Sequence, residues 1–157
     1  MIEQRKKHGP LDHLAGEGEP AVVLLVDDDP DCRMLARDAI ARCSAGCRVY
    51  EAGDGREALE FLRRPGAPRP GLIFLDIEMP GMDGQAALRA IRSDPAFREV
   101  PVVMMSGLSD DEQIRAAADA GANSYTVKPV TAELYLRAMQ QSADYWLKVH
   151  RRPRGAD

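Results

Sequence analysis

Residues 72–84 read Leu72-Ile73-Phe74-Leu75-Asp76-Ile77-Glu78-Met79-Pro80-Gly81-Met82-Asp83-Gly84, an apolar run that ends in a single acid and a glycine-rich turn. Four apolar residues in succession predict a strand buried on both faces, as in a parallel sheet. The proline and glycines that follow indicate a turn before the next helix. Open α/β sheets bind ligands at the carboxyl ends of their strands, so Asp76 is a candidate site residue. The alternative is an acid that only caps the turn.

The bulk composition indicates one ordinary globular domain. The chain has 157 residues, of which 45% are hydrophobic and 29% charged. A net charge of -4 gives no electrostatic support for binding nucleic acid. No apolar run approaches the ~20 residues that span a bilayer, and no secretory signal opens the chain. We therefore expect a cytoplasmic protein that binds neither nucleic acid nor membrane.

The three cysteines do not form a recognisable framework. Cys43 and Cys47 are spaced C-x3-C, but the chain has only one further cysteine, Cys32, and no nearby histidine that would complete a zinc site. Reduced thiols in a reducing compartment are the expected state, with a redox role as the lesser alternative.

Apolar runs and helical patterns alternate along the rest of the chain. Beyond the strand at 72–76, strands are predicted at 21–26, 47–52, 100–105 and 123–127, and helices at about 30–44, 54–62, 84–92, 109–121 and 131–149. Ser109 and Glu112 have the spacing of a capping box. Such alternation predicts an α/β fold, a doubly wound (βα)5 unit with a five-stranded parallel sheet. We expect a mobile leader at 1–19, the domain at 20–149 and a basic tail at 150–157.

Polar side chains follow four of the predicted strands. Asp27 and Asp28 end the first, Asp76 the third, Ser106 the fourth and Lys128 the fifth. In a parallel sheet these groups meet at one edge. Three close carboxylates repel one another unless a cation joins them, and Mg²⁺ favours such oxygen ligands. Because a lysine and a hydroxyl suit a phosphoryl group, the set predicts phosphoryl transfer.

These motifs resemble those of a response-regulator receiver domain. The resemblance rests on Asp27-Asp28, on Asp76 with residues 79–84, on Ser106-Gly107 and on Lys128-Pro129, and it covers about residues 21–148. It implies a flavodoxin-like strand order, 2-1-3-4-5. It also implies a response regulator of a two-component system, which takes a phosphoryl group from the phosphohistidine of a sensor histidine kinase.

The resemblance also implies roles for single residues. Asp76 would be the phosphoacceptor, and Mg²⁺ would be bound directly by Asp28, Asp76 and the backbone carbonyl of Glu78, with Asp27 acting through water. Lys128 and the Gly107 backbone would contact the phosphoryl group, and the Lys128–Pro129 bond would be cis. Ser106 would move toward the phosphoryl group and Tyr125 would follow it; the alternative for Tyr125 is a strand residue that packs without switching. Glu78, a second acid beside the acceptor, could change the dephosphorylation rate in either direction.

The final predicted helix is apolar over a wide arc. Its candidates for an interface are Tyr135, Met139, Tyr145 and Trp146. One sheet does not cover so wide an arc, so we expect part of it to be buried against another chain, unless the leader or the loop at 63–71 covers it. That loop, with the motifs at 123–125, 128–130 and 145–147, is similar to receivers that partner phytochrome-like histidine kinases. This narrower resemblance implies a homodimer formed through the C-terminal region.

Three functional classes follow. The first is a phosphorylation-switched signalling protein without an output domain or a separate enzymatic activity. The second is a phosphorelay intermediate or phosphate sink, which uses the same site and differs in phosphate lifetime and reverse transfer. The third is an interaction module that needs no phosphorylation, against which the complete acid, serine and lysine set argues.

Overall fold

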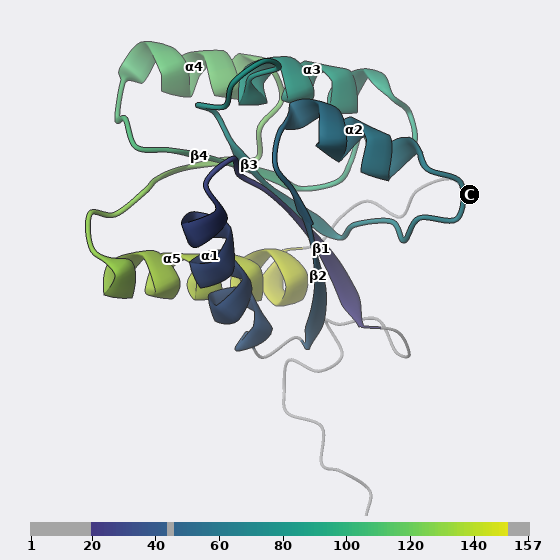
Figure 1. The fold of residues 1–157 in the computed structure, drawn as a ribbon. Coiled ribbons are helices and arrows are strands. Elements are labelled where there is room, and N and C mark those ends of the chain that lie inside the picture. The colour runs from purple at the N-terminus through teal and green to yellow at the C-terminus, as the bar shows by residue number, and fades with distance from the viewer. Residues whose placement is uncertain (1–19, 44–45, 151–157) are drawn as a thin grey trace, which may run out of the picture.

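The computed structural model describes residues 20–43 and 46–150 (Figure 1). Its elements, in chain order, are β1 (Ala21–Val26), α1 (Pro30–Ala41), β2 (Cys47–Ala52), α2 (Gly55–Arg63), β3 (Leu72–Asp76), α3 (Gly84–Ser93), β4 (Val102–Ser106), α4 (Asp111–Asp119), β5 (Ser124–Val127), α5 (Ala132–Asp144) and the π-helical turn η2 (Tyr145–Val149). The predicted leader, and the tail beyond His150, lie outside the described residues.

The five strands form one parallel sheet in the order β2-β1-β3-β4-β5. This confirms both the predicted fold class and the predicted strand order. The central strands β3 and β4 are buried at every position, because helices cover both of their faces. No helix of the described part is long and apolar enough to cross a membrane.

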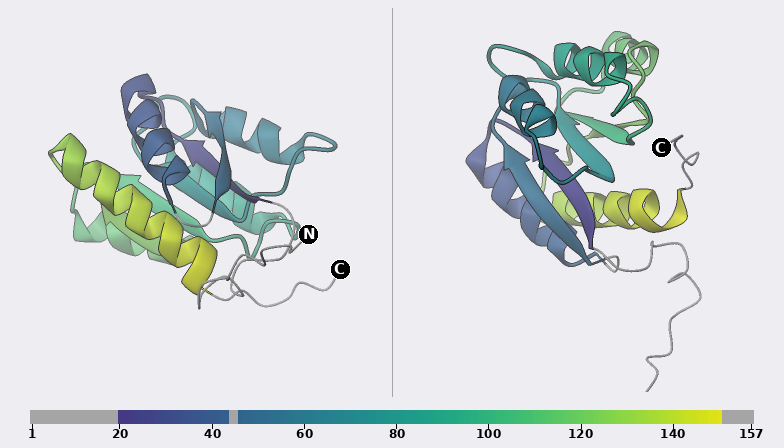
Figure 2. Two further views of the ribbon diagram at one scale, coloured as in Figure 1. Left: turned by 90° about the horizontal axis from the view of Figure 1, so that it is seen from below. Right: turned by 90° about the vertical axis from the view of Figure 1, so that its right-hand side faces the viewer.

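Alternate residues of each central strand enter two separate cores. In β3, Ile73 and Leu75 pack with the helices α2, α3 and α4, whereas Leu72 and Phe74 pack with α1 and α5. Figure 1 shows these two helix layers above and below the sheet, and Figure 2 shows α1 and α5 side by side. Helices therefore pack on both faces of the sheet, and this packing fixes the positions of its strand ends.

Side-chain caps begin all five α-helices. The capping residues are Asp29, Asp54, Asp83, Asp110 and Thr131. The predicted capping box at Ser109 is wrong: Asp110 caps α4 through the backbone N–H of Glu112, at 2.9 Å. A carboxylate at this position accepts the hydrogen bond and also interacts favourably with the helix dipole, so α4 begins one residue later than the box requires.

The last helix is covered more fully by its own chain than its pattern suggested. Tyr135 and Met139 are 6% and 2% exposed and belong to the core beneath α1, so they are not available as interface residues. Trp146 packs partly against the same core, whereas Tyr145 is 48% exposed. The reason is that α5 lies against α1 as well as the sheet, so two neighbours share its apolar arc.

Candidate functional site

The carboxyl edge of the sheet brings the predicted acids together. Each of Asp27, Asp28 and Asp76 offers a carboxylate oxygen, and these three atoms lie within 4.8 Å of one another. Asp27 and Asp76 are buried, and Asp28 is exposed. Parallel pairing of β1 with β3 produces this arrangement, because it places both strands' ends at the same edge.

Lys128 joins two of these acids. Its Nζ lies 2.9 Å from Oδ2 of Asp27 and 3.1 Å from Oδ2 of Asp76. The backbone N–H of Lys128 also donates to the carbonyl of Ser106, at 2.6 Å, so the ends of β4 and β5 are tied together. Hydrogen bonds therefore hold Lys128 at both ends, through its backbone N–H and through its ammonium group.

The cluster carries more negative than positive charge. Burial raises the pKa of Asp76 to about 7; Lys128 opposes this shift, while the charges of Asp27 and Glu78 add to it. For Lys128, burial acts against the ammonium, but the hydrogen bond and charge of Asp27, followed by those of Asp76, raise its pKa overall. Lys128 is thus protonated, but its charge does not fully offset the burial and the neighbouring charges that raise the pKa of Asp76.

The peptide bond after Lys128 differs from the expectation. No cis peptide bond occurs among the described residues, so Lys128–Pro129 is trans. The trans form is the lower in energy before proline, by roughly 0.5–1 kcal/mol. In this form the lysine already reaches both carboxylates.

Hydroxyl groups form a chain of contacts beside the acids. The fully buried Ser106 hydroxyl donates to the Glu78 carboxylate and also lies 3.3 Å from Oε1 of Gln113. The same Oε1 accepts a hydrogen bond from the Tyr125 hydroxyl, at 2.9 Å, and the carbonyl of Leu108 lies 3.1 Å from that hydroxyl. Gln113 thus connects the two predicted switch residues. Sequence reasoning missed it, because no motif marks a glutamine in the first turns of a helix.

Backbone packing holds the turn after β3 in place. The backbone N–H of Gly84 donates to the carbonyl of Ile77 at 3.0 Å, and a β-carbon on Gly84 would overlap the backbone oxygen of Asp76. The backbone N–H of Glu78 points at Oδ1 of Asp76, at 3.3 Å. Gly107, predicted to offer its backbone to a phosphoryl group, is exposed and has open space where a side chain would be.

Asp29 belongs to the start of α1 and not to the acid cluster. Its side chain caps the helix through the N–H of Asp31, at 2.9 Å, while its own N–H donates to Oδ1 of Asp27, at 2.9 Å. The cap lowers the pKa of Asp29 through its hydrogen bonds, first to Asp31 and then to Cys32. Asp29 is therefore the capping acid of α1.

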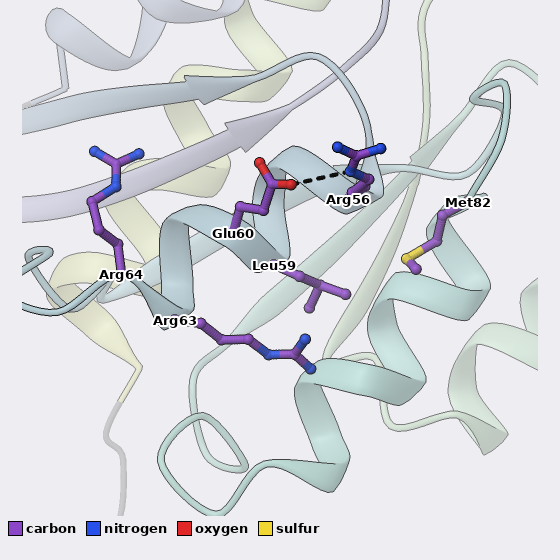
Figure 3. Close-up of a pocket in the computed structure, with 6 residues that line it drawn as sticks. All are labelled: Arg56, Leu59, Glu60, Arg63, Arg64 and Met82. Carbon is purple, nitrogen blue, oxygen red and sulfur yellow. Dashed lines mark hydrogen bonds and ion pairs between the residues drawn. The ribbon is translucent and has the colours of Figure 1, made fainter.

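A cavity of about 580 Å³ lies elsewhere, between α2 and the turn after β3 (Figure 3). Its lining residues are Arg56, Leu59, Glu60, Arg63, Arg64 and Met82. None of the clustered acids lines this cavity. The cavity and the acid cluster are therefore separate features of the described residues.

Residues 23–140 match the response regulator receiver domain family. The chain belongs to this family. It is thus a response regulator receiver domain of a two-component system, a class whose members bind Mg²⁺ in an acidic pocket and are phosphorylated by histidine kinases.

Three proteins similar to this receiver match it over most of their own length. The probable methanogenesis regulatory protein FilR2 of Methanothrix harundinacea is 32% identical over 86% of this chain and 89% of its own. The crystal structure of the phosphorylated cyanobacterial phytochrome response regulator RcpA has a TM-score of 0.82 at 28% identity, and covers 87% of this chain and 100% of that one. The Mn²⁺-bound form of Rcp1, a response regulator known from Synechocystis, has a TM-score of 0.79 at 27% identity, and covers 86% and 100%.

Proposed function

We propose that this receiver is a phosphorylation-switched response regulator, in which Asp76 accepts a phosphoryl group from a sensor histidine kinase with Mg²⁺ bound. The observation that carries the proposal is the position of Lys128, whose ammonium group spans Asp27 and Asp76 beside the carboxylate of Asp28. Residues 20–149 form the functional unit in this proposal.

The acids fit a hard divalent cation. Three carboxylates face one ammonium group, and burial raises the pKa of Asp76, so a bound cation would favour its ionised form. Asp28, Asp76 and the backbone carbonyl of Glu78 would hold Mg²⁺, with Asp27 acting through water. When bound, the ion would neutralise charge on the phosphoryl oxygens.

Phosphoryl transfer would use the residues that already meet at the sheet edge. An ionised Oδ of Asp76 forms the new bond to phosphorus, and the bond from phosphorus to the kinase imidazole breaks, with the electron pair leaving on nitrogen. Lys128 then moves its ammonium group from the Asp76 carboxylate toward the phosphoryl oxygens. Burial of Asp76 keeps water from competing for these contacts.

Phosphorylation would change the contacts of the Ser106 and Tyr125 hydroxyl groups. A phosphoryl group on Asp76 attracts the Ser106 hydroxyl, which must then leave the Glu78 carboxylate and its place beside Gln113. The Tyr125 hydroxyl shares the acceptor on Gln113, so its position responds to that of Ser106. Phosphorylation would thus favour a second arrangement of α4 and β5.

The C-terminal surface is the proposed output, as a homodimer contact. Several exposed large apolar side chains lie from β5 onward: Val127, Val130, Leu134, Tyr145 and Val149. RcpA is a phytochrome response regulator, so a phytochrome-like histidine kinase is the partner that we propose. The protein would work in the cytoplasm and would carry no separate enzymatic activity.

Phosphorylation by a small acyl phosphate tests this function. We expect a band on a phosphate-retarding gel that requires Mg²⁺, is lost in Asp76→Asn and persists in Asp29→Asn, which keeps its cap but loses the neighbouring charge. Size exclusion of the same samples tests dimer formation. If no band forms while a control receiver is labelled, the site is not a phosphoacceptor, and the interaction module that works without phosphorylation is favoured.

Phosphate lifetime separates a switch from a phosphorelay intermediate. The direct contact of Glu78 with Ser106 argues for a device that senses phosphorylation locally. We therefore expect the phosphorylated protein to hold its phosphate without passing it to a histidine phosphotransfer domain. Rapid reverse transfer to such a domain would favour the relay.

A further inference from the structure

We propose that Cys43 and Cys47 form a modification site of two thiols, which a two-electron oxidant such as a peroxide converts into an intramolecular disulfide. This site lies at the end of the sheet opposite the acid cluster, because Cys47 is the first residue of β2. It is independent of the phosphoryl chemistry proposed for Asp76.

The two sulfur atoms are already in contact. Their Sγ atoms lie 3.5 Å apart, with Cys43 just past the end of α1 and Cys47 at the start of β2. A disulfide bond is about 2.05 Å long, so the sulfur atoms must approach by roughly 1.5 Å, a distance within reach of side-chain rotation. The Cys47 thiol also contacts the carbonyl of Ile40, at 3.3 Å, which orients it at the end of α1.

Burial assigns different roles to the two thiols. Cys43 is 6% exposed, whereas Cys47 is only partly buried, so a small oxidant reaches Cys47 first. The hydrogen bond with Cys43, followed by burial, raises the pKa of Cys47. Few thiolates exist at neutral pH, so the first step is slow and responds to sustained oxidation.

The reaction balances with hydrogen peroxide as the oxidant. The Cys47 thiolate attacks one peroxide oxygen, the O–O bond breaks, and one water leaves after protonation, which gives a sulfenic acid on Cys47. The sulfur of Cys43 then attacks the sulfur of Cys47, the S–O bond breaks, and a second water leaves. Two thiols lose two electrons and two protons, and one peroxide becomes two waters.

The third cysteine supplies a matched control. Cys32 lies in α1, where its thiol donates to Oδ2 of Asp29 at 3.4 Å, and no contact with a second sulfur is present among the described residues. Burial, followed by the hydrogen bond to Asp29, raises the pKa of Cys32 to about 11. Cys32 therefore shares the low reactivity of the pair but lacks a neighbouring thiol.

The disulfide would be detected at the C-terminal helix. Both paired cysteines pack with the apolar core that Trp146 and Leu147 also contact, and Nε2 of Gln140 lies 3.4 Å from the carbonyl of Arg42. Trp146 is the only tryptophan of the chain, so its fluorescence reports on this region. Oxidation would thus change the contact between α1 and α5, the helices beneath the proposed output surface.

The test uses the full chain, treated with hydrogen peroxide, then alkylated and analysed by intact mass and peptide mapping. We expect the number of alkylated thiols to fall from three to one, a cross-linked peptide that holds Cys43 and Cys47, and reversal by dithiothreitol. Cys32→Ser should still form the link and change its Trp146 fluorescence. Cys43→Ser and Cys47→Ser should do neither, and Cys43→Ala provides a second variant if the serine disturbs the core.

Three results would overturn the proposal. One is that all three thiols stay alkylatable after peroxide treatment that oxidises a control dithiol. Another is that Cys47 proceeds to a sulfinic acid without linking to Cys43. The third is a disulfide between two chains through Cys32. Circular dichroism of each variant confirms that it is folded before these results are read.

Discussion

At the scale of single residues, Gly84 shows how closely the backbone is packed beside the acids. A β-carbon there would overlap the backbone oxygen of Asp76, and Asp76 belongs to a fully buried strand that does not yield. We predict that Gly84→Ala lowers the free energy of unfolding by roughly 1–3 kcal/mol, because the overlap outweighs the better helix propensity of alanine. Urea denaturation measures the change.

Gly107→Ala is the control for this prediction. A β-carbon on Gly107 meets no atom within 4 Å, and its φ is not positive. Its free energy of unfolding should therefore change by no more than about 0.5 kcal/mol. Equal losses in the two variants would show that crowding at Asp76 is not the cause.

The acid and lysine positions were predictable from the sequence, whereas their contacts were not. Asp76 and Lys128 follow apolar runs, and parallel pairing alone brings such strand ends together. Gln113 is different, because its bridge between Ser106 and Tyr125 depends on how α4 packs over β5. The trans state of the Lys128–Pro129 peptide bond could not be predicted from the sequence either, because a bond before proline can be cis or trans.

At the scale of elements, Arg92 joins the end of α3 to the loops that precede β4 and β5. Its guanidinium donates to the carbonyls of Gly121 at 2.8 Å and Val100 at 2.7 Å, and to Oδ1 of Asn123 at 2.6 Å. Burial lowers the pKa of Arg92, yet arginine stays charged in proteins. We predict that Arg92→Met costs roughly 2–4 kcal/mol of unfolding free energy, because several carbonyls lose a charged donor together.

Arg89→Met tests the same substitution on the exposed face of α3. The Arg89 side chain is exposed and makes no hydrogen bond or ion pair with another described residue, so this variant should unfold at nearly the same urea concentration as the wild type. A loss that matches Arg92→Met would point to helix propensity or net charge instead of the hydrogen bonds.

Periodicity predicted where the elements lie better than which of their faces are covered. The wide apolar arc on α5 was correctly identified, but Tyr135 and Met139 turned out to be core residues. The packing of α5 against α1 is a contact between distant parts of the chain, and no local spacing reveals it. The buried hydroxyl of Tyr135 has no hydrogen-bond partner among the described residues.

At the scale of the whole molecule, the acid cluster that would bind a cation destabilises the metal-free fold. The acids and Lys128 lie at the carboxyl ends of β1, β3 and β5, so the sheet holds their charges together whether or not a cation is present. The carboxylates repel one another in the folded state but not in the unfolded chain, where they are far apart. This repulsion lowers the free energy of unfolding. The site should therefore be a source of instability in the metal-free protein and of stability in the metal-bound protein.

This destabilisation should make the free energy of unfolding of the metal-free protein depend on pH. Asp76 has a pKa of about 7 in the fold, against 3.8 for an ordinary aspartate, so between these values the folded state holds a proton that the unfolded chain has released. Stability must then fall as pH rises from about 4 to about 7, by a few kcal/mol at most, and level off above. The raised pKa of Lys128 acts only near and above its ordinary value of 10.5, outside this window.

Denaturation in urea with a chelator, repeated across this pH range, checks the prediction with Asp76→Asn and Asp29→Asn alongside the wild type. Asp76→Asn should be more stable than the wild type at pH 7 and should lose most of the slope, because it carries no charge to bury. Asp29→Asn should keep the slope, since Asp29 is fully exposed and its pKa is lowered. Added Mg²⁺ should restore stability to the wild type at pH 7 and have little effect on Asp76→Asn. An unchanged slope in Asp76→Asn would place the destabilising charge on another residue, and no response to Mg²⁺ in the wild type would count against the cluster as a cation site.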